Sequence, residues 1–297
     1  MIKNKLTDSK YPNLMDIIMF LGLYFILATT VGIVTALLEK TYADVQGIRD
    51  ILSASSYIVV FVIMLLMAGA HRNIKLSNPK PVRVIRKFKR ASPFYVLFGI
   101  LAVISITFVV NPFVSLFSES LGTMYDYMGR MGTYMMLTCV IAAPLLEEML
   151  FRGIVQSDFE RRYGAFRSIV IASLIFSVIH INPAQIIYVF FVSIVLGIVY
   201  FKTKSLWTVI LIHSFNNALS ILLFNICKDR AQFISPYADY FENNTIYHIV
   251  YSVASIIVIF TMYKLLTIEN GNKENSPKID TSNQEINLED EQKEDKI

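Results

Sequence analysis

The chain has 297 residues, of which 55% are hydrophobic and only 17% are charged, and its mean hydropathy is +0.52. Soluble domains carry about 25% charged residues, so these values exclude an ordinary soluble domain. The formal net charge of +4 is small and does not indicate a nucleic-acid partner.

Apolar runs recur along the chain, and each is close to the roughly 20 residues that cross a bilayer as a helix. We predict an all-α, polytopic transmembrane helical bundle with about eight spans. Their approximate ranges are 14–38, 51–70, 94–118, 132–156, 166–184, 186–201, 205–226 and 246–266.

The positions of the basic residues predict the orientation of the bundle. Most of the 27 Lys and Arg residues fall in segments that share one side of the membrane. Positive charge accumulates in cytoplasmic loops, so we expect both termini in the cytoplasm. The basic loop 71–92 is expected to contact anionic membrane lipid rather than nucleic acid.

The two ends of the chain differ from the apolar bundle at 14–268. Residues 1–13 form a short polar lead, and residues 269–297 are acidic, polar and free of aromatic side chains. The latter composition predicts a disordered cytoplasmic tail. Cys139 and Cys227 are too few for a disulfide framework or a Cys-based metal site.

Ionisable side chains stand near the centres of only three of the expected spans. They are Glu147, Glu148 and Arg152 in the fourth span, His180 in the fifth and His213 in the seventh. Insertion of one charged group near the bilayer centre costs roughly 2.5–3.5 kcal/mol. These side chains must therefore face protein, water or one another.

Helical spacing separates the two glutamates. Glu148 and Arg152 are four residues apart with the acid N-terminal, which is the favourable order for an ion pair. Glu147 is turned by about 100° from Glu148 and is a poorer match for Arg152. We predict that Arg152 pairs with Glu148, while Glu147 projects elsewhere and acts on water as a general base.

The remaining polar residues supply other parts of a hydrolytic site. His213 and Asn217 are one turn apart, so both can donate hydrogen bonds to a developing oxyanion, and His180 can orient the water. Each residue also has a structural alternative. The ion pair can fix helix packing, a lone His can be a packing residue, and Asn217 can join two helices. The occurrence of the whole set on apolar spans favours a shared site.

Three sequence elements occur in a fixed order on separate spans. They are Glu147-Glu148-x-x-x-Arg152, Phe176-x-x-x-His180 and His213-x-x-x-Asn217. In this order they resemble the signature of the CPBP family, the CAAX-protease and bacteriocin-processing intramembrane proteases. The resemblance covers residues 144–218, within a family-like core at about 132–226.

The resemblance implies a helical-bundle intramembrane endopeptidase. It implies that Glu147 activates water with help from His180. It further implies that His213 and Asn217 stabilise the oxyanion. The supporting residues Glu148, Arg152 and Phe176 would shape the site.

We therefore expect an endopeptidase that cleaves a membrane-associated protein or peptide substrate. The alternatives are a non-catalytic immunity or scaffold protein of the same fold, and a transporter, although the sequence shows no paired repeats of the transporter type. No feature of the sequence identifies a prenylated substrate. Its richness in Ile, Lys and Asn favours a bacterial source, for which the location would be the plasma (inner) membrane.

A zinc-dependent version of the same protease is a further alternative. His180, His213 and Glu147 would then form a His₂Glu set with one open position. Usual zinc motifs place two ligands one turn apart on one helix, whereas the residue one turn after His213 is Asn217. We therefore expect no obligatory metal or other cofactor. From the depth of Glu147 in its span, we also expect the site to open toward the cytoplasmic half of the bilayer.

Overall fold

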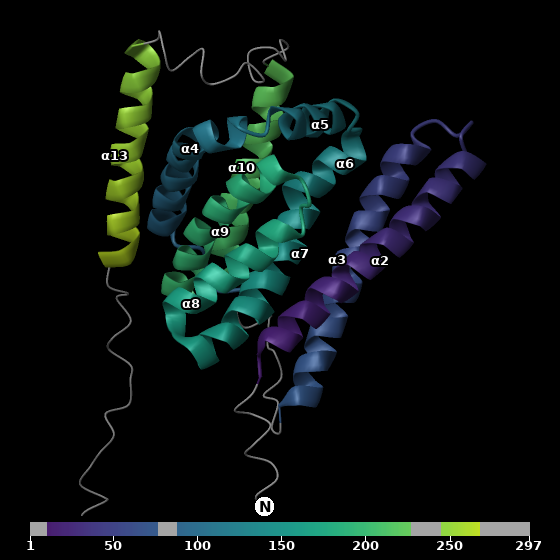
Figure 1. Ribbon diagram of the computed structural model, residues 1–297, viewed down its shortest axis with the longest axis horizontal. Helices are drawn as coiled ribbons and strands as arrows, with labels where there is room; N and C mark the ends of the chain where they lie inside the picture. Colours follow the sequence, from purple (N-terminus) through teal and green to yellow (C-terminus); the bar gives the residue numbers. More distant parts are fainter. Residues whose placement is uncertain (1–10, 77–87, 227–244, 268–297) are drawn as a thin grey trace, which may run out of the picture. The chain divides into compact units, whose positions relative to one another are not determined.

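The computed structural model describes residues 11–76, 88–226 and 245–267 (Figure 1). Within these ranges the chain is helical and contains no strand, so the prediction of an all-α fold is confirmed. The helices are α2 (Leu14–Thr41), α3 (Ile48–Lys75), α4 (Pro93–Ser115), α5 (Ser118–Gly129), α6 (Thr133–Leu137), α7 (Ala143–Leu150), α8 (Ser157–Val178), α9 (Pro183–Thr203), α10 (Leu206–Ile226) and α13 (Thr245–Thr267). The expected tail 269–297 and residues 1–10 of the polar lead lie outside the described residues.

Helices α2 and α3 form an antiparallel pair that lies side by side (Figure 1). Helix α2 begins at a capping box in which Asn13 and Asp16 each accept a hydrogen bond from the backbone N–H of the other. At the opposite end of the pair, Asp50 of α3 accepts hydrogen bonds from the backbone N–H groups of Tyr134, at 2.7 Å, and Met135, at 2.9 Å. These N–H groups belong to the first turn of α6, so Asp50 ties the helix pair to the rest of the bundle.

One helical run, Thr133–Val178, carries both glutamates and Arg152. Two π-helical stretches, Thr138–Ala142 and Phe151–Gln156, flank α7 within this run. Such stretches are frequent at functional sites. The run kinks at Gly164, where φ is 77° and ψ is 177°. After this kink α8 packs against the π-helical stretch Phe151–Gln156, and the rings of Phe176 and Phe151 have centroids 4.7 Å apart.

Six helical segments among the described residues are long and apolar enough to cross a membrane. One of them, Thr133–Val178, covers two expected spans, 132–156 and 166–184. The expected eighth span coincides with α13, in which the described apolar stretch is the shorter Ile249–Val258. The protein is therefore an integral membrane protein. The number of eight spans and the cytoplasmic location of both termini stay predictions.

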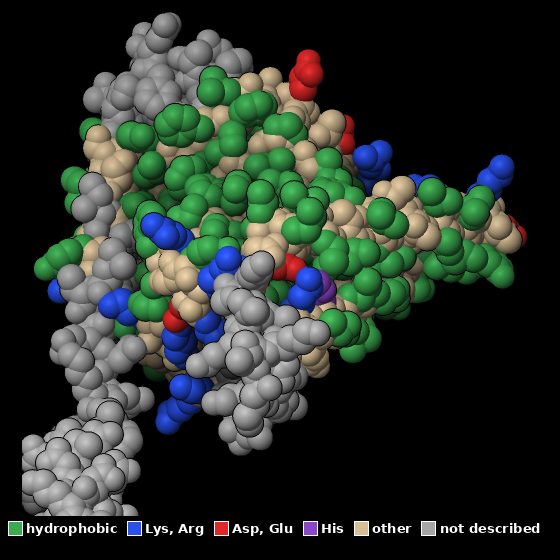
Figure 2. Space-filling view, turned by 60° about the horizontal axis from the view of Figure 1, so that its bottom comes forward, with side chains coloured by type: hydrophobic (Ala, Val, Ile, Leu, Met, Phe, Trp, Pro, Cys, Tyr) green, Lys and Arg blue, Asp and Glu red, His purple; other side chains and the backbone are tan. Residues whose placement is uncertain are grey.

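Basic side chains gather at the end of the bundle where α3 finishes and α8 begins, whereas hydrophobic side chains cover its flank (Figure 2). We call this region the basic end. It is defined by Arg72, Lys75, Arg161, Arg162 and Lys204. In the predicted orientation the basic end faces the cytoplasm.

The hydrophobic core that positions α7 lies between α3, α7 and α8. Phe61 and Met64 of α3 pack with Leu150, Phe151 and Phe176, and each of these side chains is at most 2% exposed. Because Leu150 and Phe151 lie within one helical turn of Glu147 and Glu148, this packing places both carboxylates inside the bundle.

Candidate active site

Both carboxylates of α7 are buried, with Glu147 4% and Glu148 0% exposed. They face different partners, as the helical spacing predicts. Glu148 Oε2 lies 3.1 Å from Arg152 Nε, so the predicted pairing of these two residues is confirmed. The contact is not aligned as a hydrogen bond, because Glu148 Oε2 and Arg152 Nε and Nη1 have no hydrogen-bond partner among the described residues. Charge attraction rather than hydrogen-bond geometry holds this pair.

The guanidinium of Arg152 joins α9 to the site. Its Nη2 donates hydrogen bonds to Ser193 Oγ, at 2.7 Å, and to the Ser193 carbonyl oxygen, at 3.0 Å. Its Cζ lies 5.1 Å from the centre of the Phe176 ring, within the range of a cation–π contact. Arg152 therefore connects Glu148, Phe176 and α9, and these contacts support the site from behind.

Glu147 has partners from two other helices. Tyr57 of α3 donates a hydrogen bond from its hydroxyl to Glu147 Oε1. The other carboxylate oxygen, Oε2, lies 3.6 Å from His213 Nε2 of α10. Sequence reasoning missed Tyr57, because a tyrosine in an apolar span belongs to no motif. The one available signal was that a buried tyrosine hydroxyl usually has a hydrogen-bond partner.

His213 lies between the two carboxylates. Its Nδ1 is 2.9 Å from Glu148 Oε1, and its Nε2 faces Glu147. A carboxylate held against Arg152 accepts hydrogen bonds, so His213 Nδ1 is the donor to Glu148. If neither His213 Nε2 nor Glu147 Oε2 carried a proton, their lone pairs would face each other and repel. A proton therefore belongs on either His213 Nε2 or Glu147 Oε2.

His180 follows the C-terminal end of α8, and its ring also contacts Phe176. Its Nδ1 lies 3.0 Å from the Phe176 carbonyl oxygen, which can only accept, so Nδ1 carries the hydrogen and Nε2 of the neutral ring is an acceptor. The Phe176 ring stands edge-on to both imidazoles, with centroids 5.2 Å from His180 and 6.0 Å from His213. The four-residue spacing of Phe176 and His180 thus places the imidazole against both the carbonyl oxygen and the ring of Phe176.

Asn217 binds the backbone of the helical run that precedes the glutamates. Its amide nitrogen donates to the Cys139 carbonyl oxygen at 2.9 Å. In the π-helical stretch the Ala143 N–H bonds to the carbonyl five residues earlier. Pro144, five residues after Cys139, has no N–H to give. Asn217 thus supplies a hydrogen bond that Pro144 removes from the backbone.

Two further polar residues stand near Asn217, and sequence reasoning missed both. Asn216 Nδ2 lies 3.4 Å from Asn217 Oδ1, and Asn216 Oδ1 accepts a hydrogen bond from the Tyr188 hydroxyl at 2.7 Å. The adjacent asparagines in the printed sequence were a visible signal for Asn216. Tyr188 had no such signal.

A cavity of about 560 Å³ brings the predicted site residues together. Glu147, His180, His213 and Asn217 all line it. Glu148 and Arg152 are buried behind its wall, with 0% and 1% exposed. The structure therefore separates one carboxylate that faces the cavity from one that supports it.

The direction in which this cavity extends differs from the sequence-based expectation. Within the run Thr133–Val178 it is lined by Met135, Cys139 and Ala143, which form a stripe that leads away from the basic end. Its walls also include residues of α5 and the first turn of α9. The lining therefore does not lead toward the basic end, and the side of the membrane to which the site opens stays a prediction. The sequence-based expectation rested on the depth of Glu147, His213 and His180 in their spans, whereas α5 and α9 also line the space around Glu147.

The donor atoms do not fit a metal site. Among the described residues, no group of three or more His, Cys, Asp or Glu side chains could hold a metal ion. Both nitrogens of His213 face carboxylates, and Nδ1 of His180 donates to a carbonyl. The set His180, His213 and Glu147 that sequence reasoning considered for zinc is therefore not arranged as one ligand cluster.

Comparison with known families gives one match in this part of the chain. Residues 129–219 match the family model described as Rce1-like, type II CAAX prenyl endopeptidase Rce1-like. Comparisons with curated proteins and with solved structures give no match. The matched segment contains both glutamates, both histidines and Asn217, and it supports a protease of the intramembrane CAAX type. Residues 129–219 thus match an Rce1-like domain, and the three sequence elements that resemble the CPBP family lie within this match.

Proposed function

We propose that the protein is an intramembrane endopeptidase that hydrolyses a membrane-associated protein or peptide, with Glu147 as the general base. One observation carries this proposal. Glu147 lines a cavity of about 560 Å³ together with His180, His213 and Asn217, while Glu148 is held behind the wall by Arg152. The match to a family of endopeptidases supports the reaction type.

The proposed reaction uses one water molecule in the cavity. Glu147 takes a proton from the water as its oxygen attacks the carbonyl carbon of the scissile peptide. The carbonyl π electrons move to oxygen and give a tetrahedral oxyanion. When the C–N bond breaks, Glu147 returns the proton to the leaving nitrogen. The products are a carboxylic acid and an amine, and the acid then gives its proton to the amine or to solvent. Glu147 is ionised again, as it was before the reaction.

The neighbouring groups have complementary proposed roles. The Nε2 acceptor of His180 orients the water by accepting one of its hydrogens. When Glu147 is ionised, the proton on His213 Nε2 is available as a donor to the oxyanion. One N–H of the Asn217 amide donates to the Cys139 carbonyl oxygen. Its other N–H donates to the oxyanion.

The cavity wall favours an apolar and variable substrate segment. Met124, Met128, Met131 and Met135 all line it, and unbranched thioether side chains adapt to different shapes. We propose that the substrate is a peptide stretch from the membrane or its surface, which unwinds to reach Glu147. If the source is bacterial, the enzyme acts in the plasma (inner) membrane.

The test compares full-length protein with its Glu147→Gln variant, both reconstituted in lipid vesicles with a panel of membrane peptides. Cleavage is read by mass spectrometry, and the membrane proteomes of cells carrying either form identify native substrates. The proposal expects new peptide ends only with the unmodified protein. Glu39→Gln is the matched control, because Glu39 forms an ion pair with Arg49 on the surface. Equal cleavage by the Glu147→Gln variant would refute the assigned base.

A further inference from the structure

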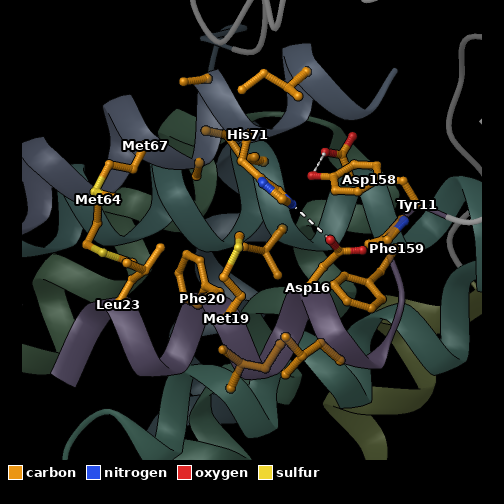
Figure 3. Close-up of a pocket in the computed structure, with 18 residues that line it drawn as sticks. Tyr11, Asp16, Met19, Phe20, Leu23, Met64, Met67, His71, Asp158 and Phe159 are labelled. Carbon is orange, nitrogen blue, oxygen red and sulfur yellow. Dashed lines mark hydrogen bonds and ion pairs between the residues drawn. The ribbon is translucent and has the colours of Figure 1, made fainter. Parts of the chain in front are cut away.

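A second cavity, of about 290 Å³, lies between α2, α3 and the residues around the start of α8. It is separate from the proposed catalytic cavity, and its two ends differ in chemistry (Figure 3). Polar side chains gather at one end, and thioether and hydrocarbon side chains gather at the other. The polar residues are Tyr11, Asp16, His71 and Asp158, and the apolar residues at the far end include Leu23, Met64 and Met67.

The apolar end of this cavity lies deeper in the bundle than the polar end. On α2, Leu23 follows Asp16 by two turns, and on α3, Met64 precedes His71 by two turns. At 1.5 Å per residue, this separation is roughly 10 Å along each helix. The cavity therefore changes from polar to apolar in the direction from the basic end toward the middle of the bundle, as an inserted lipid does.

The deep part of the cavity suits a hydrocarbon chain. Apolar cavities stay dry, and one of about 150 Å³ already binds benzene, so a cavity near 290 Å³ has room for a longer apolar group. Met19, Met64 and Met67 line it and can adapt to a flexible occupant. Met67 and Ile74 also remain 38% and 81% exposed on the apolar flank, so a chain can enter sideways from the bilayer.

The charged side chains that line the shallow part of the cavity are the carboxylates of Asp16 and Asp158, and His71 lines it beside them. Asp16 lies 2.8 Å from His71 Nε2, and Asp158 lies 3.0 Å from Arg72 Nε and 3.1 Å from the Tyr11 hydroxyl. Both carboxylates are thus paired inside the protein. Further cations lie beside them.

Lys75 is 4.0 Å from Asp16, and Arg161 is 3.2 Å from Asp158. The side chains of these two cations remain 47% and 49% exposed. Arg162 donates to the Pro12 carbonyl oxygen at 2.7 Å. Arg72, Lys75 and Arg161 thus pair with the two lining carboxylates, and Arg162 binds the backbone of Pro12, which also lines the cavity. These four cations lie around the shallow part of the cavity rather than in its lining.

We infer that this cavity binds an anionic phospholipid. One acyl chain lies between α2 and α3 against the methionines, and the phosphate lies near Lys75 and Arg161. Basic residues near a membrane surface attract anionic headgroups, and the apolar end takes the chain. Such a lipid braces α2 against α8. This matters for α2, because none of the residues in its most apolar 18-residue window is buried inside the protein.

The test uses the purified full-length chain, delipidated in detergent and titrated with phosphatidylglycerol or phosphatidylcholine of identical acyl chains. Native mass spectrometry counts the bound lipid, and thermal melting reports stabilisation by a ligand of the folded state. We expect one tightly held phosphatidylglycerol and weaker binding of phosphatidylcholine. Lys75→Gln and Arg161→Gln should each weaken phosphatidylglycerol binding about fivefold.

Filling the deep part of the cavity tests the acyl-chain site separately. Ala68 lines it, so Ala68→Phe should reduce binding of both lipids. The smaller Ala68→Leu should act in the same direction and serves if the Phe variant does not fold. Lys40→Gln and Ala36→Phe, at exposed positions of α2 outside the cavity, are matched controls without effect. Equal binding of the two lipids by the unmodified protein would overturn the headgroup assignment. Unchanged lipid binding in both Ala68 variants would overturn the acyl-chain site.

Discussion

The hydroxyl of Tyr57 on α3 donates a hydrogen bond to Oε1 of Glu147 on α7. Helix α3 lies outside the matched segment 129–219, so the proposed base is held by an element that precedes the family domain. The Tyr57 ring stacks on Phe61 with centroids 4.8 Å apart, and Phe61 is 2% exposed. A fixed ring gives the hydroxyl a fixed direction. Glu147 is thereby held with Oε2 toward His213.

Tyr57→Phe should lower the rate of peptide cleavage while leaving the protein folded. A hydrogen bond to a charged group is worth about 1.5–3 kcal/mol, so we expect kcat to fall about 10- to 100-fold if the bond is needed in the transition state. Binding of substrate, read from KM, should change less. Steady-state kinetics of the purified variant in vesicles gives both constants.

The control for this variant is Tyr24→Phe. The Tyr24 hydroxyl donates to the Ile179 carbonyl oxygen at 3.4 Å and does not line the catalytic cavity. Similar losses of kcat in the two variants would show that general packing, and not the bond to Glu147, sets the rate.

Glu148→Gln should destabilise the protein far more than Glu147→Gln. Removing one partner of a buried ion pair costs about 3–5 kcal/mol because the remaining charge is unpaired, and Arg152 is 1% exposed. Glu147 has no comparable cation, so its amide variant should melt near the unmodified protein. Thermal melting of the purified proteins in detergent measures this difference.

Restoring charge balance provides the check on this interpretation. The double variant Glu148→Gln/Arg152→Met should recover part of the lost stability, because the unpaired cation is gone. It should remain inactive if the pair positions His213, whose Nδ1 lies 2.9 Å from Glu148. Equal losses of melting temperature in Glu147→Gln and Glu148→Gln would contradict the separation of roles.

Asn217→Ala should cost both activity and stability, and Pro144→Ala should recover only the stability. Leaving a buried carbonyl without a donor costs about 1–3 kcal/mol, and Asn217 is the donor to Cys139. An alanine at position 144 offers the N–H that Pro144 lacks. In a double-variant cycle the two positions should therefore couple in melting experiments. Cleavage should stay low in both Asn217 variants, and recovery of activity by Pro144→Ala would assign Asn217 a structural role only.

The sequence predicted much of the architecture because a chain that crosses a bilayer must satisfy its backbone hydrogen bonds internally. Runs of apolar residues must be helical in a bilayer, so the helix positions follow closely from the pattern. The pairing of Glu148 with Arg152 was likewise predictable, since both lie on one helix and spacing determines which residues share a face. The described run Thr133–Val178 covers two of the expected spans, and the kink at Gly164 separates them.

Contacts between distant helices were not predictable in the same way. Tyr57 and Glu147 are 90 positions apart, and no spacing rule relates them. The placement of His213 between both carboxylates depends on the packing of α10 against α7. The side on which the cavity extends depends on α5, which carries none of the three sequence elements. Sequence periodicity predicts which residues share a face of one helix, but it does not predict which faces of different helices pack together at the site.

The catalytic cavity should be reached from the side opposite the basic end. Met128 of α5 lines the cavity, and Lys75 lies at the basic end. In a background with Cys139 and Cys227 replaced by alanine, Met128→Cys should react with a membrane-impermeant thiol reagent added outside cells. Lys75→Cys should react only after the inner side is opened. Labelling of both positions from the same side would contradict the predicted orientation or the position of the cavity.

The final prediction is that cleavage needs no metal ion. Glu147 can take the proton of the attacking water itself, and His213 and Asn217 are placed to donate to an oxyanion, so hydrolysis has the base and the donors that it requires. We expect purified active enzyme to keep its kcat after treatment with a strong chelator, and elemental analysis to give far less than one zinc per chain. Added zinc should not raise the rate. Stoichiometric zinc, with activity lost on chelation and regained on its return, would instead require His180 and His213 to turn toward a shared ligand position, and Glu147 would then act beside a metal-bound water.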